Sequence, residues 1–223
     1  GTLYAFYPYS SYGKKYEDGR VRLDLSATQS PSATSFDPNC DILVAKPQEY
    51  ETISSNTVIA DLSFARVMSV LKVNLKGEFA RDQIVKSFSF TAEGVNLAGY
   101  AAMNLENAEI TEWTNTTATS TVSAIYQTED VQIGGTSNSV YLVVAPVDIP
   151  ENTTLTFNVE TDDYYISKTV SEHGKISFPS GNIAVINLTI NEENCTPKES
   201  IDYSGEWLIT GTKADVVYAA SAY

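Results

Sequence analysis

Alternation of apolar and polar residues between Thr57 and Leu75, TVIADLSFARVMSVLKVNL, constrains the fold of this chain more than any other feature of its sequence. Successive side chains of a β-strand point to opposite faces, so a period of two over this length predicts one long strand. One face would carry Ala65, Val67, Leu71, Val73 and Leu75, and the other Phe64, Arg66, Met68, Val70, Lys72 and Asn74. That second face mixes apolar with charged residues, which predicts burial at one end and water at the other. A helix is the alternative, but residues at helical spacing form no clean apolar stripe, and β-branched residues crowd the far end.

Composition also favours a β-rich protein. The chain has 223 residues, 43% of them hydrophobic, which is enough for one large domain or two ordinary ones with a packed core. Its 14 tyrosines, with much Thr and Val, suit pleated and half-buried surfaces. Good helix formers never gather into a long run. We therefore predict an all-β or nearly all-β fold. The sequence contains no apolar run of about 18 residues, so we predict no membrane-spanning helix.

The charge balance argues against two kinds of partner. Lys and Arg number 14 against 28 Asp and Glu, so the net charge is −14. Nucleic acid and anionic lipid surfaces both need a basic footprint on the protein. We expect neither as a partner.

Shorter strands follow one another along the chain, bounded by Gly, Pro, Asn and Asp. They are predicted at residues 3–7, 21–25, 41–46, 83–91, 116–126, 140–145, 154–161, 164–170, 175–178 and 184–190. Their centres lie about 8–15 residues apart, which is typical of a β-sandwich. Gln48–Asn56 is the linker candidate, and Ala101–Glu112 is also compatible with a helical turn.

The scarcity of candidate catalytic residues and motifs predicts that this protein is not an enzyme. His173 is the single histidine, and its SEHGK context favours a turn residue over a general base. No GxSxG, GxxxxGK[ST] or HExxH pattern occurs. We predict no catalytic, cofactor-binding or metal-binding residues.

Two alternatives rest on acidic pairs that fall in predicted turns, Glu129-Asp130, Asp162-Asp163 and Glu192-Glu193. A glycosidase would need two carboxylates about 5–10 Å apart in a cleft. A calcium site would need several converging oxygens.

A third alternative is carbohydrate binding through exposed aromatic rings. The candidates are Tyr4, Phe6, Tyr7, Tyr9, Tyr12 and Tyr16 near the start, and the isolated Trp113 and Trp207. Core and cross-strand packing is the commoner use of such residues in strands.

Cys40 and Cys195 lie far apart in the sequence and have no metal-ligand spacing. Neither stands in the context of an activated nucleophile. They are either two unrelated thiols or one long-range disulfide, and a disulfide would imply an oxidising compartment.

Seven segments, in this order, carry a family resemblance that covers about residues 2–191. They are TLYAFYPYS, DILVAK, DLSFARVMSVLKVNLKG, SFSFTAEGVNLAG, VYLVVAPVDIP, TLTFNVETDDYYISKTV and FPSGNIAVINLTI. Their order resembles the fimbrillin-like (FimA/Mfa-like) proteins, which are surface lipoproteins and pilus subunits of Gram-negative anaerobes. The resemblance implies tandem transthyretin-like antiparallel β-sandwich domains. Residues 1–55 would be the later part of an N-terminal domain whose first strands are missing, and residues 56–191 a C-terminal domain. Residues 192–223 would form a linker and a β-hairpin, read from 207–210 and 216–222, that starts a further module.

The same resemblance implies a function. It is that of a non-enzymatic fimbrial (pilus) subunit or adhesin, exported through a lipoprotein precursor to the outer-membrane surface. Subunits would exchange strands with their neighbours, which is β-strand addition, and would contact a host or bacterial receptor or glycan. In many members a protease first removes an N-terminal strand, but Arg20 and Arg22 lie too late to be that cleavage site. A carbohydrate-binding surface lipoprotein is the alternative.

Overall fold

The computed structural model describes residues 2–8, 12–15, 20–49, 62–127, 131–135 and 138–198. Strands dominate this part of the chain, and its helical elements are the three-residue 3-10 turns η2 (Pro38–Cys40) and η3 (Glu192–Asn194). The all-β prediction is therefore confirmed. Among the described residues, no helix has the length and apolar character needed to cross a membrane.

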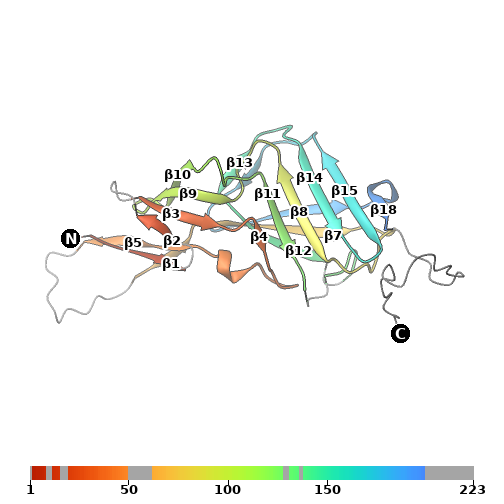
Figure 1. Ribbon diagram of the computed structural model, residues 1–223, viewed down its shortest axis with the longest axis horizontal. Coiled ribbons are helices and arrows are strands. Elements are labelled where there is room, and N and C mark those ends of the chain that lie inside the picture. The colour runs from red at the N-terminus through yellow and green to blue at the C-terminus, as the bar shows by residue number, and fades with distance from the viewer. Residues whose placement is uncertain are drawn as a thin grey trace, which may run out of the picture.

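A six-stranded sheet forms one wall of the molecule (Figure 1). Its strands, in order, are β18 (Cys195–Pro197), β15 (Tyr164–Val170), β14 (Leu155–Glu160), β8 (Ser87–Ala92), β11 (Thr121–Ile125) and β4 (Thr28–Gln29). Neighbours in this sheet are antiparallel except β11 and β4, which are parallel. The predicted hairpin of residues 154–161 and 164–170 is confirmed as β14 and β15.

A three-stranded sheet packs behind the first and closes the core. Its strands are β12 (Ser139–Val144), β7 (Ser69–Lys76) and β17 (Ile183–Thr189), with β7 in the centre. β7 runs antiparallel to β12 and parallel to β17. Phe88, Phe90 and Phe157 of the first sheet and Leu71 and Leu142 of the second are at most 2% exposed and belong to one cluster of buried side chains.

Two further sheets lie at the other end of the molecule, on the left in Figure 1. One contains β10 (Glu109–Trp113), β9 (Gly99–Asn104), β3 (Arg20–Leu25) and β2 (Tyr12–Lys15), and the other β1 (Thr2–Tyr7), β5 (Leu43–Glu49) and β6 (Phe64–Arg66). A short pair, β13 (Val147–Ile149) and β16 (Ile176–Phe178), completes the described strands. Strands β3 and β4, from residues 1–55, pair with β9 and β11, from residues 56–191. The division into domains at residue 55 stays a prediction.

The alternating stretch Thr57–Leu75 contains two strands, so the prediction of one long strand is wrong. β6 pairs with β5, whereas β7 belongs to the three-stranded sheet, and the chain passes between them at Val67 and Met68. The predicted apolar face holds for β7, because Leu71, Val73 and Leu75 are fully buried. Val67 and Met68 are both buried, 0% and 2% exposed, so the chain passes from one sheet to the other inside the core. Residues 57–61 lie outside the described part.

The predicted linker begins too early. β5 continues through Pro47 to Glu49. Its pairing with β1 shifts in register between Ala45 and Gln48, so Pro47 falls in an irregularity of the ladder. A proline is tolerated there because its missing N–H is not needed. Residues 50–56 of the linker lie outside the described residues.

Candidate functional site

His173 lies in the connection between β15 and β16, and its ring contacts two main-chain carbonyl groups. Its Nδ1 is 2.6 Å from the Gly174 carbonyl oxygen, and its Nε2 is 2.7 Å from the Thr153 carbonyl oxygen. Both ring nitrogens are thus within hydrogen-bonding distance of main-chain acceptors. These contacts fit a structural role for His173 in the loop, and its having no role as a general base stays a prediction.

Three carboxylates of the acidic pairs, on Asp162, Asp163 and Glu193, have side-chain partners. Asp162 forms an ion pair with Lys86 at 3.1 Å, and the carboxylate of Asp163 accepts a hydrogen bond from Gln83 at 2.8 Å. Glu193 accepts one from Asn191 at 3.1 Å. Among the described residues, no three His, Cys, Asp or Glu side chains come together in a way that could hold a metal ion. Glu129 and Asp130 lie outside them.

Cys40 and Cys195 are both free thiols in this structure, which contains no bond between them. Cys40 ends η2 and is 4% exposed, and this burial, with the nearby Asp37, raises the pKa of its thiol to about 12. Cys195 begins β18 and is half-buried, and its thiol contacts the Asn191 carbonyl oxygen at 3.4 Å. A disulfide between them stays a prediction.

The aromatic residues singled out by sequence do not form an exposed binding cluster where they are described. Phe6 and Trp113 pack against the core, and Tyr4 donates a hydrogen bond to Glu106 at 3.5 Å. Tyr7 is exposed, at 54%. The side chains of Tyr9, Tyr12, Tyr16 and Trp207 lie outside the described part. Tyr165, which sequence reasoning did not single out, is 57% exposed on the six-stranded sheet.

The outer edge of β17 is the first candidate interaction surface. Val70 donates to the Asn182 carbonyl, and Ile190 donates to the Lys76 carbonyl, so the even-numbered residues of this strand bond to β7. The backbone groups of odd-numbered residues therefore point away from β7. Those residues are Ile183, Val185, Asn187 and Thr189. Their outward N–H and C=O groups have one partner among the described residues, because Lys168 donates to the Thr189 carbonyl at 2.7 Å.

Side chains along β17 do not protect this edge. Natural edge strands are commonly protected by charged residues, proline, bulges or short length. β17 has seven residues, IAVINLT, with neither charge nor proline, and its pairing with β7 has no register shift. Ile183 and Val185 are 58% and 55% exposed on its outer face.

The opposite edge of the same sheet, β12, is capped at one position. The Gln29 side chain, 1% exposed, accepts a hydrogen bond from the Val143 N–H at 2.8 Å and donates to the Val143 carbonyl at 2.7 Å. Its amide thus mimics one residue of a neighbouring strand along β12. Among the described edge strands, only β1, β12 and β17 have six or more residues. Of the two edges of the three-stranded sheet, β12 is capped at Val143, whereas Val185 and Asn187 of β17 have no outward backbone partner among the described residues. No sequence pattern identified Gln29 as a cap.

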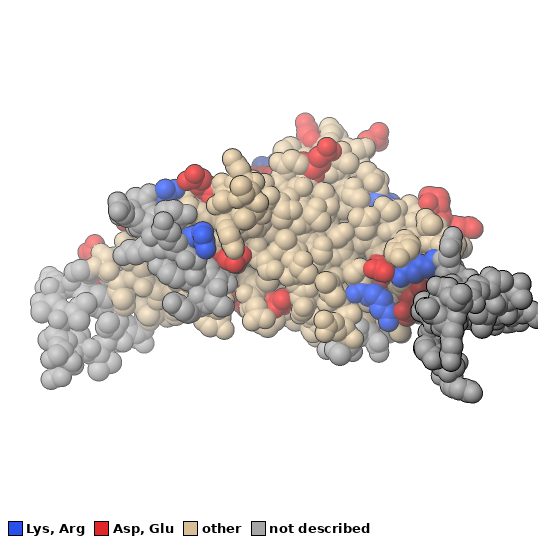
Figure 2. Space-filling model, in the orientation of Figure 1, with Lys and Arg blue, Asp and Glu red and all other residues tan. Residues whose placement is uncertain are grey.

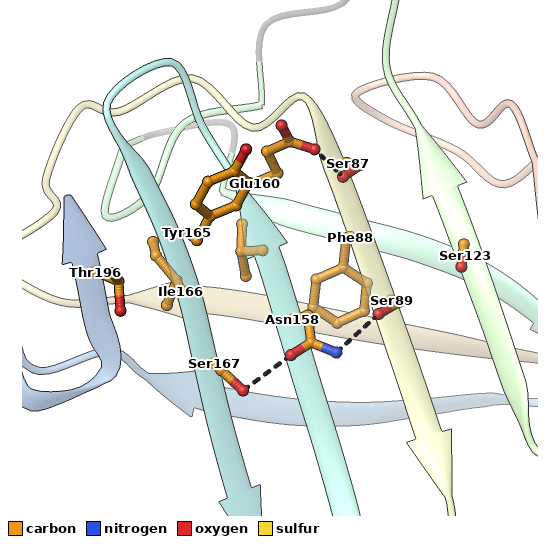
Figure 3. A pocket seen from close by; sticks show the side chains of 11 residues that line it. Ser87, Phe88, Ser89, Ser123, Asn158, Glu160, Tyr165, Ile166, Ser167 and Thr196 are labelled. Atoms are coloured by element: carbon orange, nitrogen blue, oxygen red, sulfur yellow. Dashed lines mark hydrogen bonds between the residues drawn. The ribbon is translucent and has the colours of Figure 1, made fainter. Parts of the chain in front are cut away.

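The outer face of the six-stranded sheet is the second candidate surface. A hollow of about 450 Å³ lies on it, and Figure 3 shows the side chains that line it. Most of them are small hydroxyl or amide side chains: Ser87, Ser89, Ser123, Asn158, Ser167 and Thr196. Tyr165 and Glu160 stand at one end. In the space-filling view this part of the surface is largely free of charged side chains, which gather around its margins (Figure 2).

Comparisons with known proteins agree with this architecture. A family model described as fimbrillin-like matches residues 1–204. A crystal structure of a candidate cell adhesion protein from Bacteroides ovatus is similar, with a TM-score of 0.54 at 15% identity over 94% of this chain and 69% of that one. Another, from Bacteroides uniformis, has a TM-score of 0.50 at 14% identity over 90% of this chain and 71% of that one. No curated protein matches the chain.

Proposed function

The chain belongs to the fimbrillin-like family, and we propose that it is a non-enzymatic fimbrial (pilus) subunit or adhesin that joins its neighbours by β-strand addition. It would act at the outer-membrane surface after export through a lipoprotein precursor. Family membership supports the surface location and the adhesive role. The description of the two similar solved structures as candidate cell adhesion proteins agrees with that role.

The open edge of β17 is the observation that carries the assembly part of this proposal. In strand addition, main-chain hydrogen bonds supply affinity, and side chains at alternate positions supply specificity. Val185 and Asn187 offer outward N–H and C=O groups without partners among the described residues. Ile183 and Val185 offer exposed apolar side chains beside them. A strand from a neighbouring subunit that pairs here would extend the three-stranded sheet.

The finer architecture belongs to the same proposal. Two transthyretin-like sandwiches, divided near residue 55, would form the subunit, with residues 192–223 leading into a further module. Subunits would contact each other through exchanged strands, and a receptor or glycan on a host or bacterial surface would be the adhesive target.

A proline at position 185 tests the acceptor edge. The Val185 N–H points away from β7, so Val185→Pro removes one donor of the open edge and leaves the β7–β17 ladder in place. Val185→Thr is the matched control, because it keeps that N–H and a β-branched side chain. Wild-type protein and Val185→Thr should form ladders of oligomers on unheated denaturing gels. Val185→Pro should remain monomeric while keeping its circular dichroism spectrum.

Two results would count against assembly at this edge. One is a wild-type protein that stays strictly monomeric at every concentration, alone or mixed with other subunits of the same fimbria. The other is a set of identical ladders for the wild type and Val185→Pro, which would move assembly to another edge.

A further inference from the structure

The outer face of the six-stranded sheet is built from rows of uncharged polar side chains. Cross-strand pairing places Ser167, Asn158, Ser89 and Ser123 side by side on β15, β14, β8 and β11. The neighbouring row on the same four strands consists of Thr169, Thr156, Thr91 and Thr121. A solvent-facing sheet normally carries lysines and glutamates as well. These two rows carry none, although the chain contains 14 basic and 28 acidic residues.

Hydrogen bonds join three of the four side chains of the first row. Ser167 donates to Asn158 Oδ1 at 2.9 Å, and Asn158 Nδ2 donates to Ser89 Oγ at 3.2 Å (Figure 3). An amide nitrogen has two donors and a hydroxyl has one donor and two acceptor sites. Asn158 therefore keeps one N–H, Ser89 keeps its O–H, and Ser167 keeps acceptor capacity. These groups face the hollow already oriented, which lowers the entropic cost of binding a ligand.

An aromatic ring stands one row away. Tyr165 lines the hollow, and the Lys198 ammonium lies 4.7 Å from its ring centroid. The same ammonium donates to Glu160 at 2.9 Å, so the two charges at this end neutralise each other. The pKa of Glu160 is lowered chiefly by this hydrogen bond from Lys198. The hollow thus combines a ring, hydrogen-bonding groups and no unpaired charge among its described lining residues.

We propose that this hollow binds a neutral oligosaccharide. An anionic ligand would find no lysine or arginine among the lining residues, and the Lys198 ammonium beside Tyr165 is already paired with Glu160. The centres of protein interfaces are enriched in apolar and aromatic residues, whereas the two rows consist of Ser, Asn and Thr. A sugar is complementary to both the aromatic ring and the hydrogen-bonding rows. Its C–H face can stack on the ring of Tyr165, and its hydroxyls can exchange hydrogen bonds with Ser and Asn.

The dimensions agree with a chain of sugars. The volume of about 450 Å³ lies within the usual range for ligand sites, roughly 300–1,000 Å³. The row from Ser167 to Ser123 crosses three strand spacings, or about 14 Å. A ligand that touches both ends is longer than a monosaccharide.

Isothermal titration of the purified protein with neutral hexasaccharides tests this site. Cellohexaose, maltohexaose and laminarihexaose are the probes, and hexagalacturonate is the anionic comparison. At least one neutral probe should bind saturably and more tightly than hexagalacturonate. Asn158→Ala and Tyr165→Ala should each weaken that binding about tenfold, the equivalent of losing one good contact. Tyr7→Ala, at an exposed ring on β1, is the matched control and should leave binding unchanged.

The outcomes separate this proposal from subunit assembly. Val185→Pro lies on the other sheet and should bind the sugar like the wild type. No binding of any neutral probe at millimolar concentration would overturn the proposal, as would binding that both hollow variants leave intact. Preference for hexagalacturonate would also overturn it. Self-association that Asn158→Ala abolishes would identify a second copy as the occupant instead. Thermal unfolding monitored by circular dichroism checks that the variants, all at exposed positions, remain folded.

Discussion

Replacing Gln29 should destabilise the protein far more than a change on a two-residue strand suggests. Gln29→Ala removes both hydrogen bonds to Val143 and the one that Gln29 Nε2 donates to the Ser26 carbonyl at 3.1 Å. Val143 is 1% exposed, so its N–H and C=O would be left buried without partners. Each orphaned group costs about 1–3 kcal/mol, so the free energy of unfolding should fall by about 2–6 kcal/mol. That is a large share of the roughly 5–15 kcal/mol that holds a typical domain together.

Urea unfolding followed by circular dichroism measures this loss. Thr28→Ala, at the exposed neighbour on β4, is the matched control and should change the free energy of unfolding by less than about 0.5 kcal/mol. Gln29→Met keeps the length of the side chain and removes its hydrogen bonds, so it separates lost bonds from lost volume. It should lose nearly as much stability as Gln29→Ala.

Gln29→Glu adds a pH-dependent test. A protonated carboxyl can donate to the Val143 carbonyl and accept from its N–H, as the amide does, whereas a carboxylate cannot donate. Burial therefore raises the folded-state pKa of the introduced group above its unfolded value of about 4.3. A group whose pKa is raised adds stability at low pH and loses it as pH rises through the folded pKa. The deficit relative to the wild type should be smaller near pH 5 than near pH 8.

A loss below about 1 kcal/mol for both Gln29→Ala and Gln29→Met would show that the Gln29 amide does not satisfy buried groups of Val143. A deficit for Gln29→Glu that does not change with pH would show that the amide does not bridge both Val143 groups.

The remaining predictions concern the cysteines and one glycine. Iodoacetamide at mildly alkaline pH should label half-buried Cys195 before Cys40, because burial raises the pKa of the Cys40 thiol to about 12. Intact mass measures the labelling. If the two cysteines were bridged, neither would be labelled before reduction. Gly99→Ala should lower the free energy of unfolding by at least about 2 kcal/mol, because φ there is +116° and a Cβ would lie 2.3 Å from the Thr117 carbonyl oxygen. Gly174→Ala is the control, because a Cβ there meets nothing within 4 Å. It should change the free energy of unfolding by less than about 0.5 kcal/mol in the same denaturation assay. An equal loss at both positions would contradict the steric explanation.

Local patterns in the sequence predicted strands and their buried faces well where neighbours in sequence are also neighbours in space. The hairpin of β14 and β15 needed only two alternating runs and the Asp162-Asp163 turn between them. Alternation likewise identified the buried face of β3, because Val21 and Leu23 are 3% and 1% exposed. A period of two reports which side of a strand is buried, and it is a property of a few consecutive residues.

The same kind of pattern failed where tertiary contacts decide between structures. Ala101–Glu112 was compatible with a helical turn because alanine suits helices. In the structure Ala101, Ala102 and Met103 are buried in β9, which pairs with both β3 and β10. Burial between two strands outweighs a propensity difference of less than about 1 kcal/mol per residue.

By itself, then, the sequence determined that this chain forms strands and which faces they bury. The order of its segments also indicated the fimbrillin-like family. Tertiary structure alone decided which strands pair. It divided the opening alternation between β6 and β7 and set β17 parallel to β7. It also placed Gln29 against Val143, 114 positions away. Alternation does not encode a partner, because any strand with the right buried face satisfies it. The open edge of β17 and the uncharged rows beside Tyr165 both depend on pairings between distant strands, so the candidate surfaces emerged only from the fold.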